Sequence, residues 1–282
     1  MKLRPAGIVV HVPDIEELMT ILREAAKAEI VPRFRRLTPD MVRMKSNPTD
    51  LVTEADESAE RMIHARVREL APGALFIGEE AVSANPALLD ALPGAEVAVI
   101  VDPVDGTGNF AAGLPLFAVM ASVVVKGEAV AGIIYDPMAD DFVVAERGGG
   151  AFVRTPEGVA LPLKVAPPVP LADMVGTASV ASLPAAIKPT ILANLAKVRI
   201  ASAYRCAGHE YRMFAAGHTH FAMFRKLLPW DHVAGALITA EAGAHVARLD
   251  GTPYRPEHDE GGLLMAVDKP SWDVLRREVF AL

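Results

Sequence analysis

Two aspartates three positions apart follow an apolar run near the middle of the chain. Residues 96–101 read EVAVIV and residues 102–110 read DPVDGTGNF, so Asp102 and Asp105 lie on either side of a proline and a valine. The proline restricts the backbone between them, and both carboxylates can converge on one point if the chain turns as it leaves the strand. Converging carboxylates raise each other's cost of ionisation unless a cation lies between them. An oxygen-only ligand set without His or Cys favours a hard ion, Mg²⁺ above all.

The same turn could also bind a phosphate. Gly106 and Gly108 flank Thr107, and glycines leave the neighbouring backbone N–H groups open to a ligand. If a helix begins here, its N-terminus favours an anion. The alternative is an ordinary surface turn, because Asp and Gly are the commonest turn formers.

Two further acidic segments weaken that alternative. Glu79 and Glu80 follow a second apolar run at residues 74–78, and Asp231 stands at the start of an apolar helical segment. Taken singly, the glutamates could be a solvated turn and Asp231 a helix N-cap worth about 1 kcal/mol. Taken together with Asp102 and Asp105, they indicate a metal and phosphate site assembled from several segments.

Composition and charge restrict the class of protein. The chain has 282 residues, of which 51% are hydrophobic and 22% charged, enough to bury a sizeable core. Its net charge of −7 argues against sequence-independent binding of nucleic acid, which needs a concentrated basic surface. Cys206 is the only cysteine, so no intrachain disulfide can form and a cytoplasmic location is expected. The apolar stretch at 6–12 is too short for a signal-peptide core, and no run is long enough to span a bilayer.

The order of expected elements is that of an α/β fold. Helical spacing and a capping Asp14 predict a first helix over 13–30, and a second is expected over 55–70. Short buried strands are expected at 74–78 and 96–101, followed by a β-rich stretch over 116–155. After the proline-spaced residues 165–173 the pattern alternates between strands and helices. We therefore expect two lobes, residues 1–168 with the metal-binding motifs and residues 169–282 completing the site.

Four segments occur in the order and approximate spacing of the inositol monophosphatase family. They read KSNPTDLVTEAD (45–56), IGEE (77–80), DPVDGTGNF (102–110) and WDHVAGALITAEAGA (230–244). The chain resembles this family of metal-dependent, lithium-sensitive phosphatases over most of its length. The resemblance implies a layered α-β-α-β-α sandwich of the inositol monophosphatase and fructose-1,6-bisphosphatase type, a homodimer, and hydrolysis of a small-molecule phosphate ester by direct attack of water.

The resemblance also implies a role for each matching position, with two or three Mg²⁺ ions in the site. The implied metal ligands are Glu79, Asp102, the carbonyl of Val104, Asp105 and Asp231. The implied catalytic residues are Asp56 and Thr107, which would orient the attacking water, together with Glu79. The implied phosphate-binding groups are the amides of Gly106 and Thr107, and the implied supporting residues are Glu80 and Lys45.

The substrate half departs from the family pattern. Inositol-specific members usually carry an acid a few positions before the Trp-Asp pair, where this chain has Phe224 and Arg225. Arg205, His209 and Arg212 add cations to the preceding segment. These residues are either solvated or they bind a second anionic group, with Arg205 and Arg225 the main candidates. The second interpretation favours a 3'(2'),5'-bisphosphate nucleotidase or a fructose-1,6-bisphosphatase-like activity over inositol monophosphate hydrolysis, and a binding or regulatory protein is a further alternative.

Overall fold

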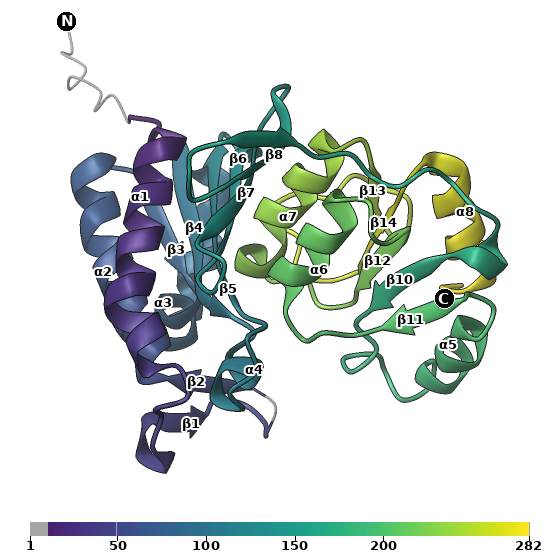
Figure 1. Cartoon of the computed structure of the whole chain (residues 1–282), viewed down its shortest axis with the longest axis horizontal. Coiled ribbons are helices and arrows are strands. Elements are labelled where there is room, and N and C mark those ends of the chain that lie inside the picture. The colour runs from purple at the N-terminus through teal and green to yellow at the C-terminus, as the bar shows by residue number, and fades with distance from the viewer. Residues whose placement is uncertain (1–10, 49, 282) are drawn as a thin grey trace, which may run out of the picture.

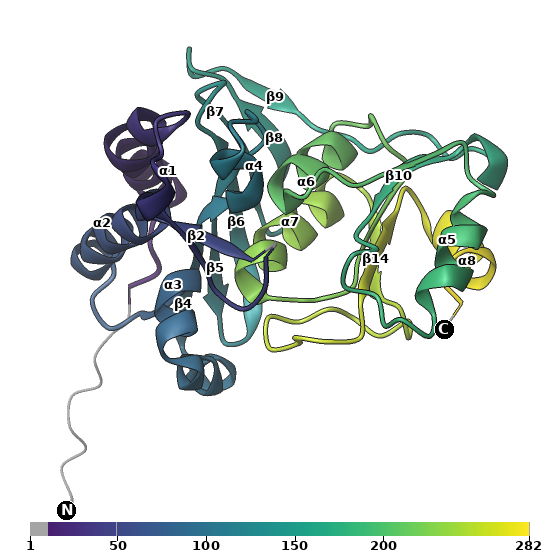
Figure 2. The same ribbon diagram turned by 90° about the horizontal axis from the view of Figure 1, so that it is seen from below.

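Helices and sheets alternate in five layers (Figure 1). The computed structural model describes residues 11–48 and 50–281. The outer helices α1 (Ile15–Ala25) and α2 (Glu54–Leu70) cover one face of a seven-stranded sheet. Helices α6 (Ala207–Ala215) and α7 (Pro229–Glu241) fill the space between this sheet and a five-stranded one, as Figure 2 shows. Helices α5 (Lys188–Leu195) and α8 (Lys269–Glu278) cover the far side. The expected α-β-α-β-α sandwich is confirmed.

The larger sheet has the strand order β3-β4-β5-β6-β7-β8-β9. Its strands are β3 (Leu75–Gly78), β4 (Val97–Asp105), β5 (Ala118–Val125), β6 (Glu128–Asp136), β7 (Asp141–Glu146), β8 (Gly150–Arg154) and β9 (Ala160–Pro162). β3 and β4 are parallel, and every later pair is antiparallel. All nine residues of β4 are buried, as expected for a strand with helices on both faces.

The smaller sheet has the order β11-β10-β12-β14-β13. Its strands are β10 (Val175–Ala178), β11 (Ile200–Ser202), β12 (Phe221–Phe224), β13 (His245–Arg248) and β14 (Leu263–Ala266). β10 is parallel to both neighbours, while β14 is antiparallel to β12 and β13. The boundary between lobes at 168 and 169 falls in the segment that joins β9 to β10, and it stays a prediction.

Shorter elements complete the chain. These are the hairpin β1 (Val42–Met44) and β2 (Leu51–Thr53), the short helices α3 (Glu79–Ala84) and α4 (Thr107–Ala111), the π-helical turn η1 (Ala26–Ile30), and the 3₁₀ segments η2 (Val31–Arg33), η3 (Pro39–Met41), η4 (Pro86–Gly94) and η5 (Leu171–Asp173). The first helix therefore ends as regular α-helix at Ala25, five residues before the expected end, because the chain continues as a wider π-turn. Its expected cap is confirmed, since Asp14 accepts a hydrogen bond from the Glu16 N–H at 2.9 Å.

Aromatic packing fixes α4 against the end of the larger sheet. Phe110 of α4 lies edge-on to Phe117, with ring centroids 5.0 Å apart, and Phe34 packs against both rings. Phe110 and Phe117 are fully buried in the core beneath α1 and α2. The turn that leads from β4 into α4 is therefore held by the main hydrophobic core.

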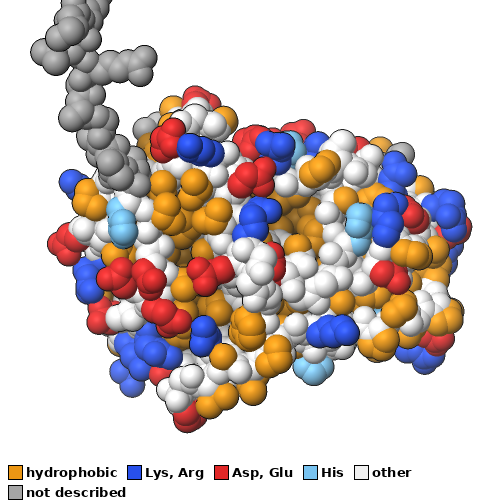
Figure 3. Space-filling model, turned by 90° about the horizontal axis from the view of Figure 1, so that it is seen from above, with side chains coloured by type: hydrophobic (Ala, Val, Ile, Leu, Met, Phe, Trp, Pro, Cys, Tyr) orange, Lys and Arg blue, Asp and Glu red, His pale blue; other side chains and the backbone are white. Residues whose placement is uncertain are grey.

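On the face seen in Figure 3, acidic and basic side chains of the described residues are interspersed, without a continuous basic patch. Within residues 11–48 and 50–281, no helix combines the length and the apolar character needed to cross a bilayer. The apolar stretch considered as a signal-peptide core lies mostly outside the described residues.

Candidate active site

The two aspartates lie within β4 rather than after it. The expected strand ended at residue 101, but β4 continues to Asp105, and its register with β5 becomes irregular between Asp102 and Asp105. The irregularity accommodates Pro103, which has no N–H to donate to a regular ladder. Gly106 follows with a left-handed φ of +88°, and α4 begins at Thr107. A helix therefore begins at this turn, which the sequence left open.

Buried carboxylates gather at this end of β4. Asp102 and Asp105 are 2% and 8% exposed, and Asp231 projects from the first turn of α7. Burial raises the pKa of Asp102, and the charges of Glu79, Asp105 and Asp231 raise it further. Burial and the charges of Glu79 and Asp105 raise the pKa of Asp231 in the same way. The charges of Glu79, Asp102, Asp105 and Asp231, the four acids implied as metal ligands, therefore act on one another.

Asp105 is oriented by the start of α6. Its Oδ2 accepts hydrogen bonds from the Gly208 N–H at 2.6 Å and from the Cys206 thiol at 3.0 Å, and its Oδ1 accepts from the Ala207 N–H at 3.2 Å. Burial raises the pKa of Asp105, although these hydrogen bonds oppose the shift. Asp105 therefore connects the end of β4 to the start of α6.

Lys45 is the cation nearest to the glutamates. Its Nζ lies 2.8 Å from Oε1 of Glu79 and 2.6 Å from Oε1 of Glu80. Burial alone would lower the pKa of Lys45, but the two carboxylates outweigh it and raise the pKa. Burial and the charge of Glu79 raise the pKa of Glu80 to about 8. Lys45, Glu79 and Glu80 thus form a partly buried ion cluster at the edge of the carboxylate group.

Asp56 and Thr107 meet as the sequence predicts. Thr107 Oγ1 lies 3.0 Å from Asp56 Oδ1 and 2.9 Å from the carbonyl oxygen of Val104. The second oxygen of Asp56 accepts from the N–H and the hydroxyl of Thr53 in a capping box at the start of α2. Asp56 is completely buried, and burial raises its pKa to about 7. A carboxylate that titrates near neutral pH is suited to accept a proton.

The chemistry of the donor set fits a hard cation, but the described side chains are not arranged around such an ion. Among residues 11–48 and 50–281, no three His, Cys, Asp or Glu side chains are placed to hold a metal ion together. Two contacts account for this, because Lys45 Nζ lies on Glu79 and the oxygens of Asp105 face the start of α6. Oxygen-only ligands and uncompensated buried charge both favour Mg²⁺ or a similar ion.

Arg205 lies against the glycine-flanked turn. Its Nη2 is 2.7 Å from the point where a Cβ on Gly108 would stand, so an alanine there would displace the guanidinium. Arg205 is exposed and has a left-handed φ of +57°. Within the part of the chain that the structure describes, its guanidinium has no hydrogen bond or ion pair. This strained backbone is held by Asn109, whose amide donates to the Tyr204 carbonyl at 2.7 Å, and by Glu210, which accepts from the Tyr204 N–H at 2.8 Å.

The other candidate cations differ from Arg205. Arg225 is half-buried at the end of β12, and its Nε has no partner in the described structure. Arg212 is bound to Asp141 at 2.5 Å, and His209 Nε2 lies 3.2 Å from the Phe117 carbonyl. The structure therefore gives Arg212 and His209 protein partners, whereas the sequence left open whether they are solvated or bind a second anionic group.

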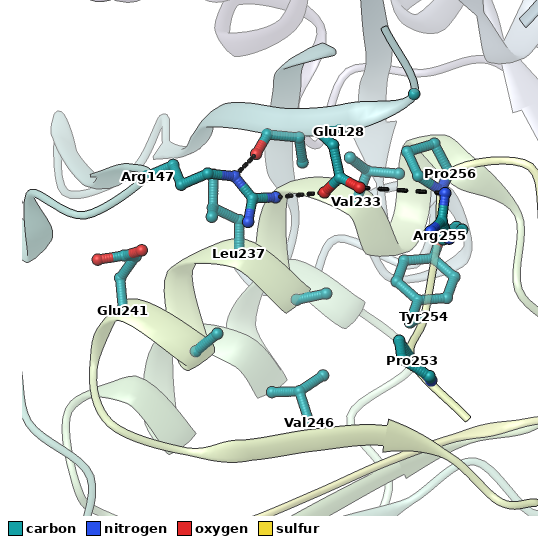
Figure 4. A pocket seen from close by; sticks show the side chains of 14 residues that line it. Glu128, Arg147, Val233, Leu237, Glu241, Val246, Pro253, Tyr254, Arg255 and Pro256 are labelled. Carbon is teal, nitrogen blue, oxygen red and sulfur yellow. Dashed lines mark hydrogen bonds and ion pairs between the residues drawn. The ribbon is translucent and has the colours of Figure 1, made fainter. Parts of the chain in front are cut away.

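A cavity of about 190 Å³ lies along another face of α7 (Figure 4). Val233 and Leu237 line its floor, and Glu128 lies between Arg147 and Arg255 at its rim. Glu128 pairs with Arg147 at 3.1 Å and more weakly with Arg255 at 4.0 Å. Its lining contains none of the clustered carboxylates, so this cavity is separate from the candidate active site.

A layered sandwich with carboxylates gathered beside a glycine-flanked threonine defines a class of phosphatases that act through metal ions. A model of the inositol monophosphatase family matches residues 14–275, and the chain belongs to this family. It is therefore an enzyme, a phosphoric monoester hydrolase.

Relatives extend over most of the chain. It is 32% identical over 241 residues to an inositol-1-monophosphatase of Bacillus subtilis, covering 83% of this chain and 88% of the relative. It is 30% identical over 213 residues to a fructose-1,6-bisphosphatase/inositol-1-monophosphatase of Thermotoga maritima, covering 75% and 77%. The crystal structure of the extragenic suppressor protein suhB from Bartonella henselae superposes with a TM-score of 0.77 at 27% identity, covering 95% and 96%.

Proposed function

We propose that this enzyme hydrolyses a small phosphorylated metabolite with Mg²⁺, by direct attack of water and without a phosphoenzyme. The observation that supports it most is the 3.0 Å contact between Thr107 Oγ1 and Asp56 Oδ1 beside the buried carboxylates. An inositol monophosphate is the first substrate to test, because that is what the Bacillus subtilis relative is named for. A homodimer and a cytoplasmic location remain predictions.

Two or three Mg²⁺ ions would be held by the side chains of the carboxylate group. The proposed ligands are Glu79, Asp102, the Val104 carbonyl, Asp105 and Asp231. Mg²⁺ bound there would lower the pKa of a water molecule and offset the charge of the phosphoryl group and the leaving oxygen. Lys45 Nζ is paired with Oε1 of Glu79, so Lys45 would compete with an ion for that oxygen.

The Thr107 hydroxyl has one proton and two oxygen neighbours. When Asp56 is ionised, Thr107 can donate to Asp56 Oδ1, and its lone pairs are then free to accept from a water molecule. When Asp56 is protonated, Asp56 can donate to Thr107, which then donates to the Val104 carbonyl. Thr107 is therefore better placed to orient the attacking water when Asp56 is ionised. Glu79 acts beside this pair as a ligand.

The phosphate would lie against the turn at the start of α4. A side chain at Gly106 is excluded because its Cβ would be 2.9 Å from the Leu116 carbonyl oxygen and the residue has a positive φ. The amides of Gly106 and Thr107 can then offset charge on the phosphoryl oxygens. With water as the attacking group, the proposal needs no nucleophilic side chain.

Phosphate release from a panel of phosphomonoesters, with Mg²⁺ and with EDTA, tests the proposal. We expect Mg²⁺-dependent hydrolysis of at least one member of the panel and no burst of covalently bound phosphate. Hydrolysis that persists in EDTA would contradict the metal assignment. A lack of hydrolysis across the panel would favour a binding or regulatory role.

A second candidate substrate class carries two phosphate groups. It is supported by Arg205, whose guanidinium lies beside Gly108 without an ion partner in the described structure, and by Phe224 at a position where a sugar-binding acid would be sought. The Thermotoga maritima relative is named for a bisphosphatase activity as well. The candidates are a bisphosphorylated nucleotide or sugar, with Arg205 and Arg225 on the second phosphate.

The comparison of two substrates decides between these classes. A charge-assisted contact contributes about 1.5–3 kcal/mol, or about one to two decades in kcat/KM. Replacing Arg205 and Arg225 by Met should lower kcat/KM for fructose 1,6-bisphosphate or adenosine 3',5'-bisphosphate by that factor and spare inositol 1-phosphate. Equal losses on both classes, or a preference of the unmodified enzyme for inositol 1-phosphate, would contradict a second phosphate site.

A further inference from the structure

Glu60 lies beneath the turn that carries Glu79 and Glu80. It belongs to α2, one helical turn after Asp56, and only 6% of the residue is exposed. Its Oε2 accepts a hydrogen bond from the Glu80 N–H at 2.8 Å, and its Oε1 accepts from the Ala81 N–H at 2.8 Å. One buried carboxylate thus accepts from the N–H groups of the second and third residues of α3.

This contact replaces a cap that α3 lacks. The residue before α3 is Gly78, which has no side chain to accept from the helix. A Cβ at Gly78 would stand 2.4 Å from Cδ of Glu60, so the glycine is required for the carboxylate to approach. The cap of α3 is therefore supplied from a different helix, and it links α2 to the turn between β3 and α3.

The contacts also show what Glu60 does not do. Both of its oxygens are occupied by backbone N–H groups, so in this arrangement neither is directed to the carboxylate cluster as a ligand. A third acid beside Glu79 and Glu80 adds repulsion, which the N–H groups of Glu80 and Ala81 and the charge of Lys45 oppose. Such an acid is costly to bury unless it is hydrogen-bonded. The buried position of Glu60 is explained if the N–H groups at the start of α3 need its carboxylate as an acceptor.

We propose that Glu60 is a positioning residue: it fixes the backbone from which Glu79 and Glu80 project, and thereby sets the affinity of the site for Mg²⁺. This inference rests on the proposed function, because it assigns Glu79 to a metal ion. Glu60 touches neither substrate nor metal in this scheme. Its effect should appear in metal binding rather than in the chemical step.

The test compares Glu60→Gln with Asp136→Asn. Asp136 is a matched control, since it is also buried and its Oδ1 accepts from the N–H groups of Met138 at 2.8 Å and Ala139 at 3.2 Å. In Glu60→Gln, an amide NH₂ group replaces one of the two carboxylate oxygens. A donor then faces a backbone N–H that has lost its acceptor. The readouts are the melting temperature without metal, the Mg²⁺ concentration at which half of the enzyme is loaded, obtained from the dependence of the melting temperature on Mg²⁺, and KM for substrate.

We expect both variants to melt at a lower temperature without metal. The half-maximal Mg²⁺ concentration should rise about tenfold in Glu60→Gln, which corresponds to about 1.4 kcal/mol, and stay within about twofold of the unmodified enzyme in Asp136→Asn. KM for substrate at saturating Mg²⁺ should change little in either variant.

An unchanged Mg²⁺ midpoint in Glu60→Gln, with or without a loss of stability, would overturn the inference and leave Glu60 a structural residue. If Glu60→Gln does not fold, Glu60→Asp keeps the charge but shortens the side chain by one methylene, and the same shift in midpoint is expected. If Mg²⁺ does not stabilise the unmodified enzyme, the proposed function fails first and this inference fails with it.

Discussion

Removal of the Thr107 hydroxyl tests the proposed orientation of the attacking water. Thr107→Ala deletes the contacts to Asp56 at 3.0 Å and to the Val104 carbonyl at 2.9 Å and leaves both carboxylate and carbonyl in place. A hydrogen bond to a charged group contributes about 1.5–3 kcal/mol. If it contributes only in the transition state, each 1.36 kcal/mol is about tenfold in rate, so kcat should fall by about 10- to 150-fold.

The assay is phosphate release at several Mg²⁺ concentrations, with Thr107→Ser as the matched control. The serine variant keeps the hydroxyl and should retain kcat within about fivefold. The alanine variant lacks the hydroxyl and should show the full fall in kcat. The Mg²⁺ concentration for half-maximal rate should change by less than about threefold in both, because the hydroxyl is not a principal ligand.

Two results would refute this reasoning. One is a Thr107→Ala variant that keeps kcat within about twofold, which would mean that the hydroxyl does not orient the water. The other is a loss that appears wholly as a higher Mg²⁺ requirement, which would make Thr107 a metal ligand. Circular dichroism spectra and melting temperatures of the variants establish that any loss is not a loss of folding.

Three further predictions concern charge. Asp102→Asn should nearly abolish hydrolysis with an unchanged circular dichroism spectrum, and normal Mg²⁺-dependent turnover would contradict a metal ligand at this position. Lys45→Met should lower the Mg²⁺ concentration for half-maximal stabilisation by about threefold, because Glu79 no longer has to exchange an ammonium; a higher concentration would show that Lys45 assists binding. Burial raises the pKa of Glu210 to about 7 from 4.5, so its contribution to stability is full below pH 4.5 and declines as the pH rises through 7. Urea titrations at pH 5 and pH 8 give the free energy of unfolding of both proteins. Between these pH values, the free energy of unfolding of Glu210→Gln should fall by roughly 2–3 kcal/mol less than that of the unmodified enzyme. Equal falls in the two proteins would contradict the raised pKa of Glu210.

The sequence predicted those helices and strands that are marked by a capping residue or by a run of apolar residues. Asp14 and the apolar spacing that follows it are enough to place α1, and the apolar runs place β3 and the start of β4. The hairpin β1–β2, the edge strand β9 and the elements β13, β14 and α8 were not expected. Strands of three or four residues leave too few positions for an alternating pattern, and their pairing depends on distant partners.

Some residues of the candidate site could also be predicted from local sequence, and others could not. Asp102, Asp105 and Thr107 lie within six residues, so their chemistry can be read from one segment. Glu60 and Asn109 could not be found in this way, because each acts on backbone groups and such contacts leave no motif of residue types. A buried acid one helical turn after a capping-box acid is the only available signal, and it does not show which N–H groups it meets.

The ion cluster at Lys45 connects metal binding with the stability of the fold. Acids that are buried beside one another favour folding only when a cation offsets them, and in this arrangement Lys45 does so for Glu79 and Glu80 but does not contact Asp102 or Asp231. A bound cation would relieve the remaining repulsion, and a ligand that binds only the folded state adds about 2.7 kcal/mol at 100 times its dissociation constant. Lys45 lies directly after β1, and its N–H donates to the Asp50 carbonyl at 2.8 Å. If Glu79 binds a metal as proposed and Lys45 is displaced, the contact between the β1–β2 hairpin and α3 would also change. In these proposals, metal affinity is set from two sides of α3, by Lys45 in front of its glutamates and by Glu60 behind them.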